Sequence, residues 1–219
     1  NIEEASVKIK ELYRNGAHFM GEMCSPHPGQ EAAILQSLQN KMSNKESVSC
    51  VDYAYVDFSG MSVSDIPFTD SYFEYARFEK TTFKNCDFSM CILSHSIIIN
   101  AVFENCTFIG SNLGASHITG SSFINCDLTD GILGKADLQS VVFTNCKISG
   151  KMEAFLEIKC KNSRFESCVM PKSIFVDTDL TGCSFKGSDL TESNFLNPII
   201  QDAVFDESKL AGTNFIKTT

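Results

Sequence analysis

The chain has 219 residues, of which 43% are hydrophobic and 21% charged, and its formal net charge at pH 7 is −9. This is the composition of a folded protein, and the negative charge disfavours direct binding to nucleic acid, because phosphate binding depends on Lys and Arg. No stretch approaches the roughly 18 consecutive apolar residues that a membrane-spanning helix needs. The sequence begins without Met or a signal-peptide pattern, so we expect a fragment or a processed chain.

Residues 1–49 are predicted to be α-helical, with a first helix at the start and a second that begins near residue 28. Apolar residues recur at helical spacing in two groups: Ile2, Ala5, Ile9 and Leu12, then Ile34, Leu35, Leu38 and Met42. Because the open end of a stacked β-structure needs a cover, we interpret this helical pair as a cap on the N-terminal end of residues 50–219. A separate functional role for the pair is the alternative.

Residues 50–219 follow a five-residue rule. Every fifth residue from Phe58 to Ile148 is large and apolar, and the series resumes from Phe165 to Phe215. The residue two positions before each is small in most repeats, typically Ser, Cys, Ala or Thr. A period of five fits neither an α-helix nor a flat strand. We therefore predict a solenoid in which the large residues point inward.

The repeat resembles that of the pentapeptide-repeat family, whose unit is a small residue, Asp or Asn, Leu or Phe, Ser or Thr, and Gly. Val56–Gly60, Ser111–Gly114, Thr178–Gly182 and Ser188–Thr191 match this unit closely, and the resemblance extends from Val51 to Lys217. It implies an all-β solenoid, a right-handed quadrilateral β-helix with four pentapeptides in each coil of twenty residues. About eight such coils would follow the helical cap.

Intervals of twenty residues support the coil length independently. Phe83, Phe103, Phe123 and Phe143 recur at this spacing, and after a two-residue shift the series continues at Phe165. The repeat is thus interrupted near residues 150–162. Insertions in solenoids often lie on the binding face, so this segment is either a recognition loop or a simple bulge. Its charged residues are the candidates for recognition: Lys151, Glu153, Glu157 and Lys159.

The cysteines and histidines do not form a recognisable site in the sequence. Cysteines stack at one corner at Cys86, Cys106, Cys126, Cys146 and Cys168, where we interpret them as small buried hydrophobic residues. A straight column presents parallel side chains, whereas zinc needs four converging ligands. His95 and His117 fall in outward slots with no paired carboxylate or nucleophile at a recognisable spacing, and the corner Asn residues are interpreted as turn formers. We therefore predict no catalytic, metal-binding or cofactor-binding residue.

Most outward slots are polar, but four close together are apolar. We predict that Ile92, Ile97, Ile99 and Val102 lie on adjacent faces of the same coil, either as a contact patch or as ordinary surface.

These features favour a non-catalytic protein–protein interaction module. In style, the helical start and the irregular, Phe-rich repeats resemble the β-helix regions of enterobacterial type III secreted effectors, some of which precede a HECT-like ubiquitin ligase domain. That resemblance implies a monomeric bacterial protein, cytosolic or secreted into a host cell, that binds a protein partner. The many thiols indicate a reducing compartment. If the chain is a fragment, its parent could carry a catalytic domain elsewhere.

The alternative function is that of the quinolone-resistance members of the family, which mimic DNA and bind DNA gyrase. The net charge of −9 fits this hypothesis. Those members dimerise through a helix after the last coil, whereas this sequence ends just after the repeat at Phe215, and its acidic residues alternate with Lys. We therefore place DNA mimicry second and an enzyme with an unrecognised active site third.

Overall fold

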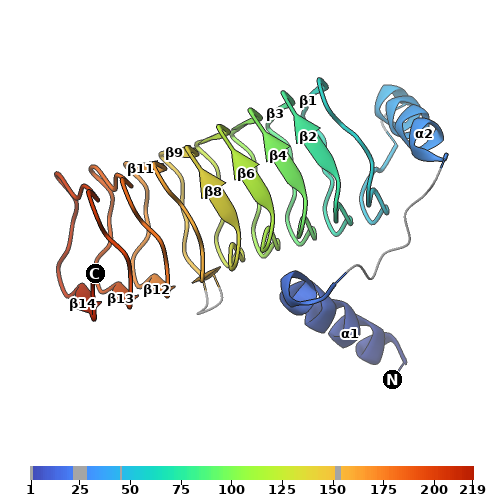
Figure 1. Cartoon of the computed structure of the whole chain (residues 1–219). Helices are drawn as coiled ribbons and strands as arrows, with labels where there is room; N and C mark the ends of the chain where they lie inside the picture. Colours follow the sequence, from blue (N-terminus) through green and yellow to red (C-terminus); the bar gives the residue numbers. More distant parts are fainter. Residues whose placement is uncertain (1, 22–28, 45, 151–153) are drawn as a thin grey trace.

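The computed structural model describes residues 2–21, 29–44, 46–150 and 154–219. Figure 1 shows a long rod of stacked coils with two helices near its N-terminal end. The helices are α1 (Ile2–Gly16) and α2 (Glu31–Asn44), and a short 3-10 helix, η1 (Ala17–Phe19), follows α1. The rod is a parallel β-solenoid of about eight coils, so the predicted fold is confirmed. No helix in the described ranges is long and apolar enough to cross a membrane.

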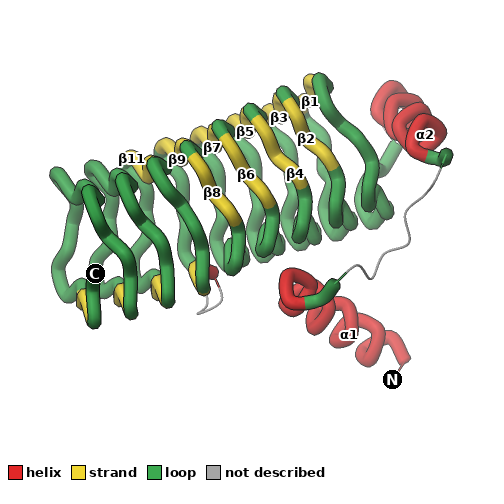
Figure 2. The backbone as a smooth tube through the Cα atoms, viewed as in Figure 1, coloured by secondary structure: helices red, strands yellow, loops and turns green. Residues whose placement is uncertain are grey.

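Each coil has four faces, which we number in the order in which the chain meets them. Face 1 carries β10 (Phe155–Leu156), β12 (Ile174–Val176), β13 (Asn194–Leu196) and β14 (Asn214–Ile216). Face 2 carries β2 (Arg77–Glu79), β4 (Ile97–Ile99), β6 (His117–Thr119) and β8 (Asp137–Gln139). Face 3 carries β1 (Ser62–Ser64), β3 (Thr82–Lys84), β5 (Val102–Glu104), β7 (Ser122–Ile124), β9 (Val142–Thr144) and β11 (Arg164–Glu166). Face 4, centred on Phe68, Phe88 and Phe108, is joined by isolated bridges, and the strands are short segments between turns (Figure 2).

The five-residue period arises from a left-handed backbone conformation at every corner. Asn85, Asn105, Asn125 and Asn145, each two residues after an inward-pointing residue, all have a φ of 53°. Asn tolerates this conformation better than most residues, and its amide also bonds along the rod. Asn105 Nδ2 donates to Asn85 Oδ1 at 3.3 Å, and Asn125 Nδ2 donates to Asn105 Oδ1 at 3.1 Å. The interpretation of these Asn residues as turn formers is confirmed.

The core consists of the inward residues, which stack on their counterparts in the next coil. On face 3 the ring centroids of Phe103 and Phe123 are 4.8 Å apart, as are those of Phe123 and Phe143. The ring planes in the two pairs differ by only 12° and 14°. All three rings are fully buried. Stacking therefore places each coil in fixed register with its two neighbours.

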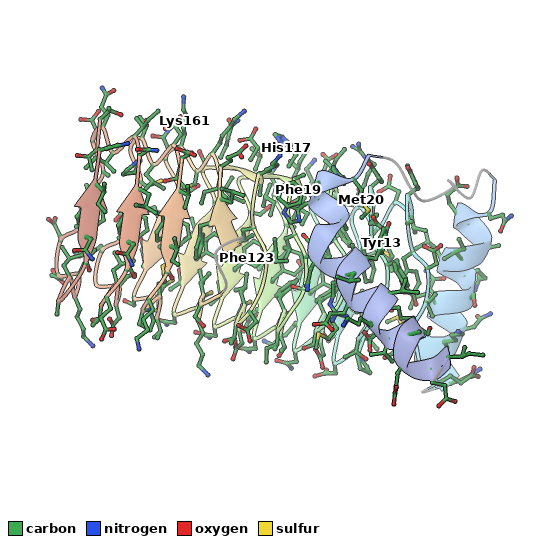
Figure 3. The ribbon with its side chains drawn as sticks, turned by 90° about the horizontal axis from the view of Figure 1, so that it is seen from below. Tyr13, Phe19, Met20, His117, Phe123 and Lys161 are labelled. Atoms are coloured by element: carbon green, nitrogen blue, oxygen red, sulfur yellow. The ribbon has the colours of Figure 1, made fainter. Side chains whose placement is uncertain are left out.

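The predicted helical cap is correct for α2 and wrong for α1. Leu38 of α2 is buried in the core of the rod, and Ile34, Leu35 and Met42 pack against that core. By contrast, α1 lies beside the rod, along face 1 (Figures 1 and 3). It meets the rod through Tyr13 and Arg14: the Tyr13 ring lies 6.5 Å from that of Tyr72, and Tyr13 Oη donates to Glu74 at 2.8 Å. The apolar pattern of α1 therefore did not indicate the side by which this helix docks.

The interruption of the repeat is shorter than the predicted 150–162. Backbone N–H groups that donate to the following coil reach a carbonyl 19 residues later before the insertion, as from Leu128 N to Lys147 O, and 21 residues later across it, as from Leu133 N to Ala154 O. Phe155 is already in register, because it pairs with Phe175. Residues 154–162 are thus part of a regular coil, and the register of the inter-coil bonds changes by two residues between Ser149 and Ala154.

Candidate functional site

The column of cysteines is part of the core. Cys86, Cys106, Cys126, Cys146 and Cys168 are buried, and each thiol lies within 3.3–3.7 Å of the carbonyl oxygen of an inward residue one coil earlier. Ser188 continues this column one coil after Cys168, and its hydroxyl donates to the Phe165 carbonyl at 2.6 Å. Cysteine therefore serves here as a small residue with a weak donor. No cluster in the described ranges groups three or more side chains that could hold a metal ion.

Burial also holds two further core thiols in the protonated form. It raises the pKa of the Cys91 thiol, and it raises that of Cys160, which occupies an inward slot on face 2. The thiolate is the reactive form, so a raised pKa combined with burial makes a poor nucleophile.

Titration with Ellman's reagent checks this conclusion. Cys24 lies outside the described residues, so we would use a Cys24→Ser background, which leaves one exposed thiol, Cys50, and eight buried ones. We expect one thiol to react rapidly in the native protein and the other eight only after unfolding. A second thiol that reacts rapidly before unfolding would contradict the buried column.

The residues around His117 form a hydroxyl–imidazole–carboxylate series on face 2. His117 Nε2 lies 3.1 Å from Thr119 Oγ1, and its Nδ1 lies 3.5 Å from Asp137 Oδ2. His117 is exposed, whereas Thr119 and Asp137 are half-buried in nearby outward slots of face 2. The nearby backbone N–H groups of His117 and Gly120 already donate to carbonyls of adjacent coils, which leaves neither of them to stabilise an oxyanion. The geometry thus resembles that of a catalytic triad but lacks the other parts that acyl transfer requires.

The predicted patch of four apolar residues is reduced to three. Ile92 occupies an outward slot as predicted, but only 3% of its surface is exposed, because α1 covers it; the prediction that it contributes to an open surface is wrong. Ile97 and Ile99 of β4 are half-buried on face 2, and Val102 of β5 is half-buried across the adjoining corner on face 3. We refer to Ile97, Ile99 and Val102 as the Ile97 patch.

Polar residues surround the Ile97 patch in the coils above and below. Ile97 pairs with Arg77 and His117, and Ile99 with Glu79 and Thr119. Val102 lies between Thr82 and Ser122. An apolar centre with a polar rim is the usual anatomy of a protein-binding surface.

The predicted charged candidates lie further along the rod. Lys159 is exposed in an outward slot of face 2, between Asp137 and Asp179, and Glu157 is exposed at the corner between faces 1 and 2. Lys151 and Glu153 fall outside the described residues. Lys159 thus shares face 2 with Ile97 but is three coils away from it.

Face 1 carries two features that sequence reasoning missed. In its N-terminal half, α1 and η1 cross several coils. The Arg14 guanidinium lies 3.6 Å from Asp70, His95 Nε2 lies 3.3 Å from the Ala17 carbonyl oxygen, and the Lys135 ammonium lies 4.7 Å from the Phe19 ring centroid.

In the C-terminal half of face 1, apolar residues are aligned in consecutive outward slots, and we call this column the Leu156 ladder: Leu156, Val176, Leu196 and Ile216. Their spacing of twenty is visible in the sequence and could have revealed the column.

Comparisons with known proteins found one family model and several solved structures that are similar to this chain. Residues 116–195 match a family model described as the pentapeptide repeat region. Similar solved structures include a trypsin-treated form of QnrB1, a plasmid-mediated fluoroquinolone resistance protein, at 18% identity and a TM-score of 0.49; the match covers 77% of this chain and 90% of that one. Another is HetL, a pentapeptide repeat protein involved in heterocyst differentiation regulation from the cyanobacterium Nostoc sp. strain PCC 7120, at 13% identity and a TM-score of 0.33, covering 83% and 92%. Curated proteins include no match to this chain.

Proposed function

The coils of this chain are pentapeptide repeats, and from that premise we propose that it is a protein-binding scaffold with no catalytic chemistry of its own. In this proposal the solenoid supplies a rigid surface, and a protein partner binds on faces 2 and 3. The partner is a host-cell protein if the chain belongs to a secreted bacterial effector, as its resemblance in style suggests.

The observation that carries this proposal is the Ile97 patch. Two isoleucines and a valine are partly exposed around one corner, whereas their neighbours in the adjoining coils are charged or polar. The centre of such a surface contributes most of the binding free energy once water is excluded, and the polar rim limits which partners fit. Because the coil beneath is held by stacked core residues, little conformational entropy is lost when a partner binds.

The pairing of charges disfavours the DNA-mimic alternative. Acidic residues on successive coils are paired with lysines, as in Lys84–Glu104 at 3.1 Å and Lys147–Asp127 at 3.4 Å. Lys161–Asp179 at 3.2 Å continues this pattern further along the rod. A mimic of DNA needs rows of unpaired negative charge at the spacing of phosphates, and these columns alternate in sign.

Replacement of Ile97 or Ile99 with Asp tests the proposal. We would use the purified chain as bait in bacterial and eukaryotic lysates and identify the retained proteins by mass spectrometry. A specific partner should be retained by the unmodified chain and bind at least about tenfold more weakly to either variant, as expected for a side chain at the centre of an interface.

The matched control is Ile109→Asp, because Ile109 is 39% exposed on face 4 of the same coil. The control should retain the partner at full strength. If no variant on face 2 affects retention, the Ile97 patch is not the binding surface. Retention of DNA gyrase subunits by all variants would favour the DNA-mimic hypothesis instead.

A further inference from the structure

Face 1 has a covered half and a bare half, and its apolar outward slots lie in the bare one. Figure 3 looks onto this face and shows α1 over the N-terminal coils, while no described residue covers the strands near the C-terminus. Under the helix, two outward slots of the column hold Glu74, which accepts a hydrogen bond from Tyr13, and Gly114, which faces His18 at close range. In the bare half the same column continues as the Leu156 ladder. The apolar residues therefore stand where the covering helix does not reach.

The Leu156 ladder is a continuous apolar surface. Its four side chains lie directly above one another in the parallel register of β10, β12, β13 and β14. Ile216 is 46% exposed and the other three are half-buried, as is Ile174 in the second outward slot of β12. Strands are spaced about 4.8 Å apart, so the ladder is roughly 14 Å long. A contiguous column of this kind marks a site of interaction, whereas scattered apolar residues do not.

The corner beside the ladder carries negative charge that the rod does not neutralise. Glu157 and Asp177 are exposed there, one coil apart, and neither forms an ion pair with a described residue. By contrast, Asp127 on face 4 pairs with Lys147 of the next coil at 3.4 Å. A hollow of about 480 Å³ opens at the corner, and its charged lining residues are Glu157, Lys159, Asp177 and Asp179. Carboxylates outnumber the ammonium group in this hollow, so it favours a cation from outside the chain.

The contact of α1 with the covered half shows how a helix meets this face. Arg14 of α1 lies 3.6 Å from Asp70, which is a corner residue at the other edge of face 1. Asp70, Glu157 and Asp177 share the left-handed backbone conformation, with φ of 56°, 54° and 52°. A cation on a helix therefore already pairs with a corner carboxylate in the covered half, and the bare half offers two more carboxylates in equivalent geometry.

The spacing of the ladder suits a helix better than an extended strand. Successive turns of an α-helix are about 5.4 Å apart, close to the roughly 4.8 Å between coils, so residues one turn apart can pack beside successive side chains of the ladder. Residues on one side of an extended strand are about 6.6 Å apart, and the match is lost after one step.

We propose that the bare half of face 1 binds an α-helix of a partner protein that is apolar on one side and carries Lys or Arg beside it. The apolar side packs on the Leu156 ladder, and the cations pair with Glu157 and Asp177 as Arg14 pairs with Asp70. A helix with acidic flanks is repelled by the same carboxylates. The contact spans about three helical turns, which is small, so we expect a Kd in the micromolar range.

This site goes beyond the proposed function, because it lies on another face than the Ile97 patch. The two surfaces can hold two partners at once, or two segments of one partner. In the second case the linked contacts bind more tightly than either contact alone.

Fluorescence anisotropy with a labelled peptide tests the proposal on the full chain. The probe is a peptide of about 15 residues, long enough to become helical, with Leu along one side and Lys on the other. The unmodified chain should bind this Lys peptide, and Leu196→Asp should weaken the binding at least about tenfold. Glu74 occupies the same outward slot of an earlier coil, so a carboxylate at this position is compatible with the folded rod.

Charge reversal tests the edge of the contact. The double variant Glu157→Lys/Asp177→Lys should bind the Lys peptide at least about tenfold more weakly, and it should bind a matched peptide with Glu in place of Lys more tightly than the unmodified chain does. Asp202→Lys/Asp206→Lys makes the same change in net charge at exposed positions on and beside face 3. This control should bind both peptides like the unmodified chain.

Ile109→Asp, on face 4, is the control for Leu196→Asp and should bind the Lys peptide at full strength. Equal binding by Leu196→Asp, or no binding by the unmodified chain, would overturn the proposal, as would a preference of the unmodified chain for the Glu peptide. Sedimentation velocity without peptide tests the other occupant: a dimer that Leu196→Asp abolishes would assign the ladder to a second copy and overturn the proposal too. Partner retention at the Ile97 patch is measured with other variants, so failure of this site and failure of the proposed function are distinguishable.

Discussion

Replacement of Phe123 with alanine is expected to lower the free energy of unfolding by about 3–5 kcal/mol, the usual cost of removing a buried phenylalanine side chain. Phe123 is fully buried, and its ring stacks on Phe103 and Phe143 with centroid distances of 4.8 Å on both sides. Its loss leaves a cavity between two coils that the stiff backbone ladder cannot close. Urea unfolding followed by circular dichroism measures the effect.

Phe215→Ala is the matched control, because the same side chain is removed from the same kind of inward slot. Phe215 is 38% exposed, and its ring stacks at 4.7 Å on Phe195, its counterpart one coil earlier. We expect a loss of about 1 kcal/mol or less, since little buried surface is lost and no closed cavity forms. Equal losses for the two variants would show that stacking between coils is not what stabilises the rod.

A milder change separates volume from aromatic stacking. Phe123→Leu keeps most of the apolar volume, and Leu113 and Ile118 already fill inward slots of the same coil. A cost near 1 kcal/mol would assign the stability to filled volume, whereas a cost close to that of Phe123→Ala would assign it to the stacked rings.

The rod could be predicted from the sequence because its structural rule is local and repeated. Each coil uses the same five-residue unit, so a single inward residue such as Phe103 predicts those at Phe83 and Phe123. The insertion was the exception. Phe155 is in phase with Phe175, and Cys160 fills an inward slot as a small residue, so the regular repeat resumes earlier than the sequence pattern indicated.

The candidate surface was harder to predict because it depends on contacts between distant segments. Ile92 lies in an outward slot, and nothing in its own repeat indicates that α1 covers it. Hydrophobic spacing in α1 correctly indicated a helix, but which side meets the rod is decided by Tyr13 and Arg14, whose partners are about 60 residues away. The Leu156 ladder, by contrast, required only that outward slots be compared at intervals of twenty.

The attachment of α1 to face 1 depends on the absence of a side chain at Gly114. A Cβ atom placed on this residue would lie 2.5 Å from His18 Cβ and 2.7 Å from His18 Cγ, far inside van der Waals contact. The backbone of Gly114 is not in the left-handed region, so alanine is compatible with its conformation. The same Cβ would also lie 2.9 Å from Asn112 Oδ1, but Ala54 occupies an equivalent turn, where its N–H donates to Asp52 at 2.9 Å. The clash with His18 is therefore the decisive one.

Gly114→Ala is expected to detach η1 and the end of α1 while the coils stay folded. Overpacking at such a contact costs about 1–3 kcal/mol, and a coupling free energy of that size corresponds to roughly a 5- to 150-fold change in an equilibrium. Limited proteolysis with trypsin reports the change. Arg14 is mostly shielded beside Asp70, so cleavage after Arg14 should be faster by about that factor in the variant.

Removal of the clash from the other side should reverse this effect. His18→Gly deletes the atoms that the new Cβ would meet, so the double variant should return toward the slow cleavage of the unmodified chain. The recovery should be incomplete, because the 3.2 Å contact between His18 Nδ1 and Asn112 Nδ2 is also lost. Unchanged cleavage in Gly114→Ala would mean that α1 is not attached through this contact.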